Sequence, residues 1–99
     1  MIIAIDWDKT ITAHPSCFIE VIQVFKKWGH DVIIATGRKG IHDKIEAPHF
    51  WGTQIFYCGD RYKKDVVREY LPHDEIIWID DEPGHIEPSR KLNFNEEQQ

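Results

Sequence analysis

The sequence predicts an α/β fold in which a small parallel sheet of about four strands is flanked by helices. Short apolar runs rich in β-branched residues alternate along the chain with segments whose apolar residues follow helical spacing. Each apolar run leads directly into polar or charged residues. Such alternation is typical of parallel sheets, because right-handed helical crossovers join neighbouring parallel strands.

Composition limits the class of protein. The chain has 99 residues, of which 41% are hydrophobic and 29% charged, with a formal net charge of -5 at pH 7. These values exclude collagen-like and disordered classes, and the negative charge argues against a general nucleic-acid coat protein. No apolar stretch approaches the roughly 20 residues of a spanning helix, and no basic leader precedes the first strand, so we expect a cytoplasmic protein without a membrane partner.

The length fits a single domain, which we expect over residues 1–87, with 88–99 as a flexible C-terminal tail poor in large apolar residues. The first strand is expected over Ile2–Ile5, an apolar run that fits burial on both faces. Pro15-Ser16 then opens a helix that ends at Gly29. The second strand is expected over Val32–Ala35.

The pattern weakens between Lys39 and Gly52, where Ile41 and Ile45 indicate a short helix ahead of an aromatic loop. That loop, His49-Phe50-Trp51, could stack a base, but aromatic residues beside a strand more often fill a core. The third strand is expected over Gln54–Cys58. A helix from Lys64 to Leu71 and a fourth strand over Ile76–Ile79 complete the pattern.

Polar residues gather where the predicted strands end, which is where open parallel sheets bind ligands. In chain order they are Asp6, Asp8 and Thr10, then Thr36, Gly37 and Arg38, then Lys63 or Lys64, then Asp80 and Asp81. Several close carboxylates repel one another unless a cation neutralises them, and oxygen ligands favour Mg²⁺ over zinc. The hydroxyl, ammonium and backbone amide groups suit the oxygens of a phosphoryl group.

In order and placement, these residues resemble the four motifs of the haloacid dehalogenase (HAD) superfamily. Asp6-Trp7-Asp8-Lys9-Thr10 matches the first motif, Asp-x-Asp-x-Thr after a central strand. Thr36 matches the second motif, and Asp80-Asp81 matches the fourth. Lys63 is favoured for the third because Lys-x-Asp at a helix start is the common family pattern, with Lys64 as the alternative. The resemblance covers most of the chain and implies a three-layer Rossmann-like core.

The resemblance also implies an activity: Mg²⁺-dependent phosphomonoester hydrolysis through an aspartyl-phosphate intermediate. Asp6 would be the nucleophile, and Asp8 would act as general acid and then as base. Thr36 would hold a phosphoryl oxygen, and Lys63 would offset negative charge. The implied metal ligands are Asp6, Asp8, Asp80 and Asp81, and the implied substrate-binding residues are Thr10, Gly37, Arg38 and Lys64.

The segments between the motifs are too short for a folded cap domain, and the resemblance implies that a capless member takes bulky substrates or covers its site by forming a homo-oligomer. Six basic residues near the expected site predict a positive mouth: Lys9, Arg38, Lys39, Arg61, Lys63 and Lys64. We expect a nucleotide or nucleic-acid end as substrate, ahead of sugar phosphates and phosphoproteins. The alternative is a noncatalytic HAD-like phosphate-binding or regulatory module.

Overall fold

The computed structural model describes residues 1–46, 50 and 52–88, and it shows an α/β fold built on one sheet. Four parallel strands lie in the order β3-β2-β1-β4. Their bounds are Ile2–Ile5 for β1, Asp31–Thr36 for β2, Gln54–Tyr57 for β3 and Ile76–Ile79 for β4. The predicted parallel α/β sheet is confirmed, and its arrangement is compatible with a Rossmann-like fold.

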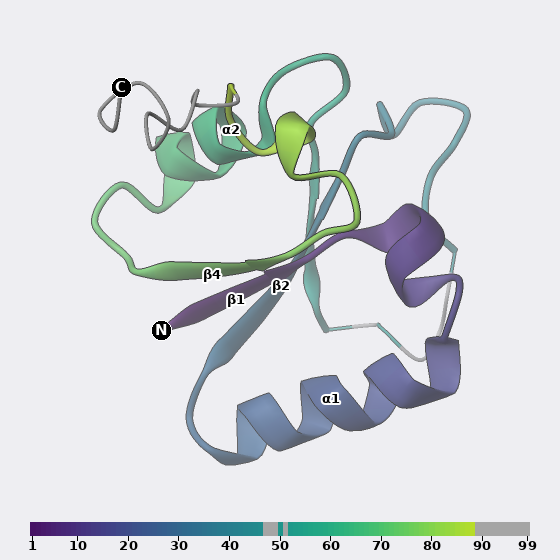
Figure 1. Ribbon diagram of the computed structural model, residues 1–99, viewed down its shortest axis with the longest axis vertical. Helices are drawn as coiled ribbons and strands as arrows, with labels where there is room; N and C mark the ends of the chain where they lie inside the picture. Colours follow the sequence, from purple (N-terminus) through teal and green to yellow (C-terminus); the bar gives the residue numbers. More distant parts are fainter. Residues whose placement is uncertain (47–49, 51, 89–99) are drawn as a thin grey trace, which may run out of the picture.

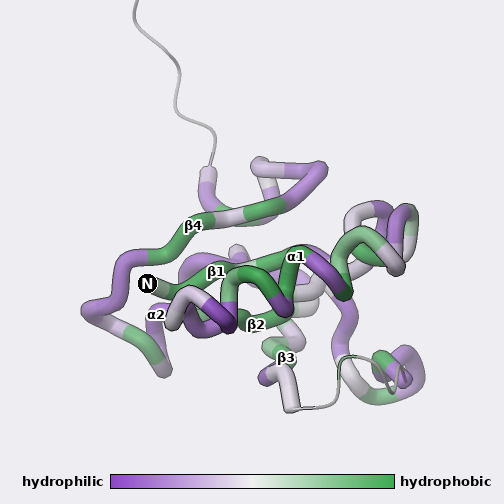
Figure 2. The backbone as a smooth tube through the Cα atoms, turned by 90° about the horizontal axis from the view of Figure 1, so that it is seen from below, coloured by the Kyte–Doolittle hydropathy of each residue, from purple (hydrophilic) through white to green (hydrophobic). Residues whose placement is uncertain are grey.

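A helix lies on each face of the sheet (Figure 1). Helix α1, Pro15–Lys27, packs on the face that holds Ile3 and Ile5. Helix α2, Lys63–Tyr70, packs on the opposite face, with Ala4. Because successive strand residues point to opposite faces, a central strand covered on both sides must be apolar throughout, as β1 is (Figure 2).

The ends of α1 follow the local chemistry of the chain. Pro15 occupies the first turn, where a missing N–H costs no hydrogen bond. The helix ends at Lys27, and Gly29 follows with a φ of 85°, a left-handed conformation that suits glycine. Among the described residues, no helix is long and apolar enough to cross a membrane.

The short helix indicated by Ile41 and Ile45 is wrong for the described part of that segment, because residues 39–46 form an irregular loop. The Asp43 carboxylate accepts the backbone N–H groups of Lys39 and Gly40, at 3.2 and 2.8 Å. An aspartate side chain that bonds nearby backbone amides competes with helix formation. A side chain at Gly40 would also collide with the Tyr57 ring, since an added Cβ would come within 2.7 Å of it.

Aromatic packing secures the loop segments to the sheet. The rings of Trp7 and Phe50 meet edge to face with centroids 5.2 Å apart, and both are buried. Phe50 therefore fills the core rather than offering an exposed stacking surface. His49 and Trp51, its neighbours in the predicted aromatic loop, lie outside the described residues, as does the expected tail from residue 89 onward.

A tight turn, η1, spans Trp7–Ile11 directly after β1 and brings the chain back over the sheet edge. Within it Lys9 has a φ of 64°, the one positive value among the described non-glycine residues. A left-handed conformation costs a non-glycine residue about 1–2 kcal/mol, whereas glycine adopts it freely. This strain is located next to Asp8.

Replacing Lys9 by glycine should therefore raise the free energy of unfolding by about 0.5–1 kcal/mol, after allowing for the greater flexibility of glycine in the unfolded chain. Gln23→Gly is the matched control, because Gln23 is an exposed residue inside α1 and its replacement should lower stability by about 1 kcal/mol. Urea unfolding of both variants measures the two changes. A loss of stability in Lys9→Gly would show that the turn does not strain the lysine.

Candidate functional site

Topology brings the polar ends of three strands together. β1 pairs with β2 on one side and with β4 on the other, so Ile5 lies opposite both Ile34 and Ile79. The backbone N–H of Asp6 donates to the Ile79 carbonyl at 2.9 Å, which extends the pairing by one residue. Asp6 therefore lies at the centre of the carboxyl edge of the sheet, next to the start of the loop after β4.

Lys63 links this edge to the start of α2. Its ammonium donates to Oδ1 of Asp6 at 2.7 Å and to Oδ2 of Asp80 at 2.6 Å. The side chain of each of the three residues is less than a tenth exposed. Burial pushes the pKa of Lys63 down, but the hydrogen bonds to the two carboxylates outweigh it and hold the pKa above its usual value. The ammonium is therefore a permanent charge in this site.

The pKa of Asp6 is raised, although its carboxyl group contacts an ammonium group. Burial raises its pKa from 3.8 to about 6, the Lys63 hydrogen bond opposes that rise, and the nearby carboxyl of Asp81 adds to it. Asp81 responds in the opposite direction, with its pKa lowered chiefly by a hydrogen bond with Asp6. Asp6 and Asp81 thus compete for a proton at close range.

A cluster of carboxylates surrounds the free side of Asp6. Asp6, Asp80 and Asp81 each offer an oxygen, and these oxygens lie within 4.8 Å of one another. The Thr10 hydroxyl lies 3.2 Å from Oδ2 of Asp6 and 3.3 Å from Oδ1 of Asp81, but its single proton can serve only one of them. The three carboxylates have too few hydrogen-bond donors to satisfy all of their oxygens, and such a group of hard oxygen ligands could hold a metal ion.

Asp8 forms a separate ion pair with Arg38 at the more exposed edge of the site, which we call the rim. Its two oxygens accept Nε and Nη2 of Arg38 at 3.0 and 2.7 Å, a bidentate arrangement. Hydrogen bonding to Arg38 lowers the pKa of Asp8. Arg38 is held in turn by the Asp43 carbonyl, and its backbone N–H donates to the hydroxyl of Thr36. Thr36 itself is fully buried at the end of β2.

A small cavity of about 160 Å³ lies beside Asp6 and Lys63, and neither Thr36 nor Arg38 is among its lining residues. Five of the residues predicted from the sequence line it: Asp6, Asp8, Gly37, Lys63 and Asp81. Thr10 and Asp80 contact that group through hydrogen bonds to Asp6 and Lys63. Lys64, the alternative for the motif lysine, turns away and pairs with Glu87 at 2.8 Å.

The cavity also has lining residues that were not among the predicted site residues, namely Lys9, Glu82 and His85. His85 belongs to the short helix η3, Pro83–His85, and its Nε2 lies 3.0 Å from a carboxylate oxygen of Glu82. These residues follow strand ends like the predicted ones. The available sequence signal was their position, Lys9 after the first apolar run and Glu82 and His85 after the fourth, although position alone did not say which of them would turn inward.

The predicted positive mouth is largely neutralised. Of its six basic residues, five form ion pairs with carboxylates: Arg38 with Asp8, Lys39 with Asp60, Arg61 with Glu69, Lys63 with Asp6 and Asp80, and Lys64 with Glu87. The two opposite charges of an ion pair largely cancel for a ligand that is still far away, and salt screens what remains. The region around the site is therefore not strongly cationic.

Comparisons of the chain with protein-family models, with curated proteins and with solved structures found no match. The observations that bear on function are the geometry around Asp6 and the order of the polar residues that follow the four strands.

Metal binding should depend on Asp81, which is exposed and can be changed without disturbing the core. We expect a hard divalent cation to raise the thermal unfolding midpoint, and Asp81→Asn to weaken its apparent affinity on the order of tenfold by removing one anionic ligand. Asp31→Asn, at the opposite end of β2, is the matched control and should keep wild-type affinity. An unchanged titration in Asp81→Asn would exclude this cluster as the metal site.

The raised pKa of Asp6 predicts a specific pH dependence in chelator-treated protein. The pKa of Asp6 is about 6 in the folded protein and 3.8 in the unfolded chain. The free energy of unfolding that a protonated Asp6 contributes is therefore complete below pH 3.8 and is lost as the pH rises through 6. Asp6→Asn removes that loss, so its unfolding midpoint should rise relative to that of wild type between about pH 4 and about pH 7, with little further change above this range. A difference between the two proteins that stays flat over this range would contradict a raised pKa.

Proposed function

We propose that this chain is a Mg²⁺-dependent phosphomonoester hydrolase of the HAD type, a minimal capless phosphatase that works through an aspartyl-phosphate. The observation that carries the proposal is the placement of Asp6. One of its oxygens contacts Lys63, and the other faces Thr10 and Asp81 in a cavity of about 160 Å³. The order Asp-x-Asp-x-Thr, Thr, Lys, Asp-Asp along four strand ends supports the same assignment.

In this mechanism an Asp6 oxygen attacks the phosphorus of the ester, and the leaving alcohol takes its proton from Asp8. Water then attacks the aspartyl-phosphate while Asp8 accepts a proton, which releases inorganic phosphate and restores Asp6. Lys63 keeps the Asp6 oxygen in position and offsets charge on the phosphoryl oxygens. Mg²⁺ bound by Asp6, Asp80 and Asp81 would supply charge neutralisation and orientation of the phosphoryl group.

Thr36 and Arg38 fit the binding of the phosphoryl group. The Thr36 hydroxyl accepts the backbone N–H of Arg38, so the buried Thr36 side chain holds the loop that carries the guanidinium group. Guanidinium groups bind phosphate in the same bidentate manner as they bind a carboxylate. A substrate phosphate would therefore compete with Asp8 for Arg38, and Asp8 would be freed for proton transfer as the substrate binds.

The Arg38 ion pair also favours a second candidate function. A carboxylate held by two hydrogen bonds from Arg38 is a poor proton donor, and a chain in which this pair persisted would bind phosphate and metal without turnover. Such a chain would be a noncatalytic phosphate-binding or regulatory module. The two functions make different predictions for phosphate release.

Release of phosphate from an aryl phosphate should require both Mg²⁺ and Asp6. Asp6→Asn removes the nucleophile at nearly constant volume, so kcat should fall by at least about 1,000-fold, whereas Asp31→Asn should keep wild-type turnover. Turnover in Asp6→Asn near that of wild type would refute a covalent role for Asp6. Mg²⁺-dependent binding of beryllofluoride by a wild-type protein without turnover would favour the binding module.

A further inference from the structure

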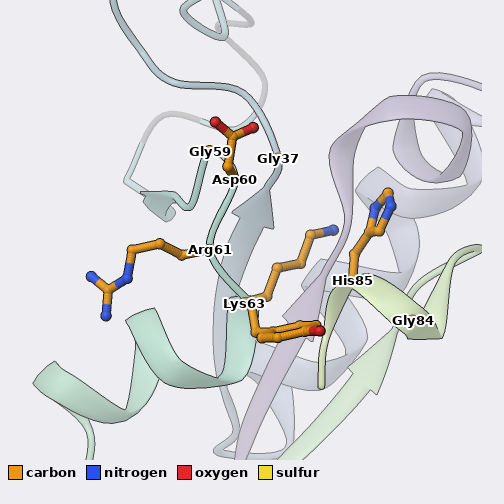
Figure 3. Close-up of a pocket in the computed structure, with 8 residues that line it drawn as sticks. Gly37, Gly59, Asp60, Arg61, Lys63, Gly84 and His85 are labelled. Carbon is orange, nitrogen blue, oxygen red and sulfur yellow. The ribbon is translucent and has the colours of Figure 1, made fainter. Parts of the chain in front are cut away.

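A second cavity adjoins the first. It has a volume of about 370 Å³ and lies between the loop after β2, the loop before α2 and η3. The two cavities share Gly37, Lys63 and His85 in their walls. We call the larger one the side groove. Figure 3 shows Lys63 and His85 at the side groove, with Arg61 pointing away from both of them.

The walls of the side groove are held by contacts outside the groove itself. The backbone N–H of Lys64 donates to the Ile86 carbonyl at 3.0 Å, which fixes η3 against the start of α2. On the other wall, the backbone N–H of Cys58 donates to the Thr36 carbonyl at 2.8 Å. The groove is therefore formed before any ligand binds, and its volume lies in the range of about 300–1,000 Å³ that is usual for small-molecule sites.

The lining of the side groove combines main chain with one aromatic ring. Gly37, Gly59 and Gly84 present peptide groups rather than side chains, and Tyr62, a residue that is two-fifths exposed, supplies an aromatic ring. Flat ligands can lie close to peptide groups where no side chain intervenes. An exposed aromatic ring stacks on any flat aromatic ligand, because every such ligand has a π face.

The charges around the side groove are already paired. Asp60 pairs with Lys39 at 3.5 Å, Arg61 pairs with Glu69, and Lys63 pairs with Asp6 and Asp80. His85 lies 3.0 Å from Glu82. Binding to a polynucleotide or to further phosphates depends on cationic groups that neutralise them. Of the cations in the described lining, Lys63 is held by two buried carboxylates, and Arg61 points away from Lys63 and His85 (Figure 3). The groove therefore fits an uncharged ligand.

We propose that the side groove binds the leaving group of the phosphomonoester, and that this group is an uncharged molecule with a flat aromatic ring, as in a nucleoside monophosphate. This proposal rests on the proposed function, because it places the phosphoryl group in the smaller cavity beside Asp6. The ester then spans the shared boundary at Lys63 and His85, and its ring stacks on Tyr62. Tyr62 sets specificity without touching the reacting atoms.

The test compares adenosine 5′-monophosphate with glycerol phosphate, an ester without a ring, in the presence of Mg²⁺. We expect wild type to prefer the nucleotide in kcat/KM, and Tyr62→Ala to lower that preference about tenfold, mainly through a higher KM. Tyr62→Phe keeps the ring and should keep the preference. Trp28→Ala is the matched control, because Trp28 is an exposed aromatic residue at the end of α1 that does not line the groove.

Two results would overturn the proposal. One is an equal or reversed preference between the two esters in wild type, and the other is a preference that Tyr62→Ala leaves intact. A short oligonucleotide with a terminal phosphate is the third substrate. A kcat/KM for it that exceeds the value for the mononucleotide would assign the site to nucleic-acid ends instead.

Failure of the proposed function gives a different result, because wild type would then release phosphate from no ester. In that case titration calorimetry of the same two esters tests the side groove by binding alone. Binding of the nucleotide that is tighter than that of glycerol phosphate, and that weakens in Tyr62→Ala but not in Trp28→Ala, would uphold the groove. Equal binding of both esters, or binding of neither, would overturn it.

Discussion

The ammonium of Lys63 is the constraint on which the rest of the site depends. It comes from the first turn of α2 and neutralises Asp6 after β1 and Asp80 after β4, all three nearly without access to water. Two buried carboxylates without that ammonium would repel each other and lose their solvation, which is the costly case for buried charges. One side chain thus fixes the position of a helix, the ends of two strands and the ionisation of the proposed nucleophile.

The ion pair between Arg38 and Asp8 has a different physical character. Its side chains are 29% and 50% exposed, so water and salt screen it far more than they screen Lys63. A phosphate can exchange with Asp8 for Arg38 at little cost, whereas nothing displaces Lys63 so easily. The site therefore has a rigid interior and an exchangeable rim, which suits both the proposed phosphatase and the alternative module up to the point of proton transfer.

How far the sequence predicted the structure depended on burial. The bounds of β1 and β4 were predicted correctly, because each is a continuous apolar run that ends at polar residues. β1 is apolar because both of its faces are covered, whereas β4 lies at the edge of the sheet and leaves Ile77 46% exposed. The preference for Lys63 over Lys64 came from the Lys-x-Asp pattern of the resemblance and not from periodicity, since neighbours on a helix point about 100° apart and packing decides which turns inward. The loop around Asp43 and the ion pairs of the rim depend on side chains that meet across loops, which periodicity does not report. The sheet edge and its order of polar groups were therefore accessible from the sequence, and the charge balance around them was not.

The central position of β1 has a consequence for how the protein is made. A ribosome produces β1 first and β2 soon after, but the other edge of β1 stays open until β4 emerges, and Thr10 and Asp81 are 71 positions apart. An apolar strand with an open edge is prone to pair with other chains, so β1 is open to wrong pairing until β4 has been made. The same delay means that the site around Lys63 forms late, because Asp6 cannot meet Asp80 before β4 has docked on β1.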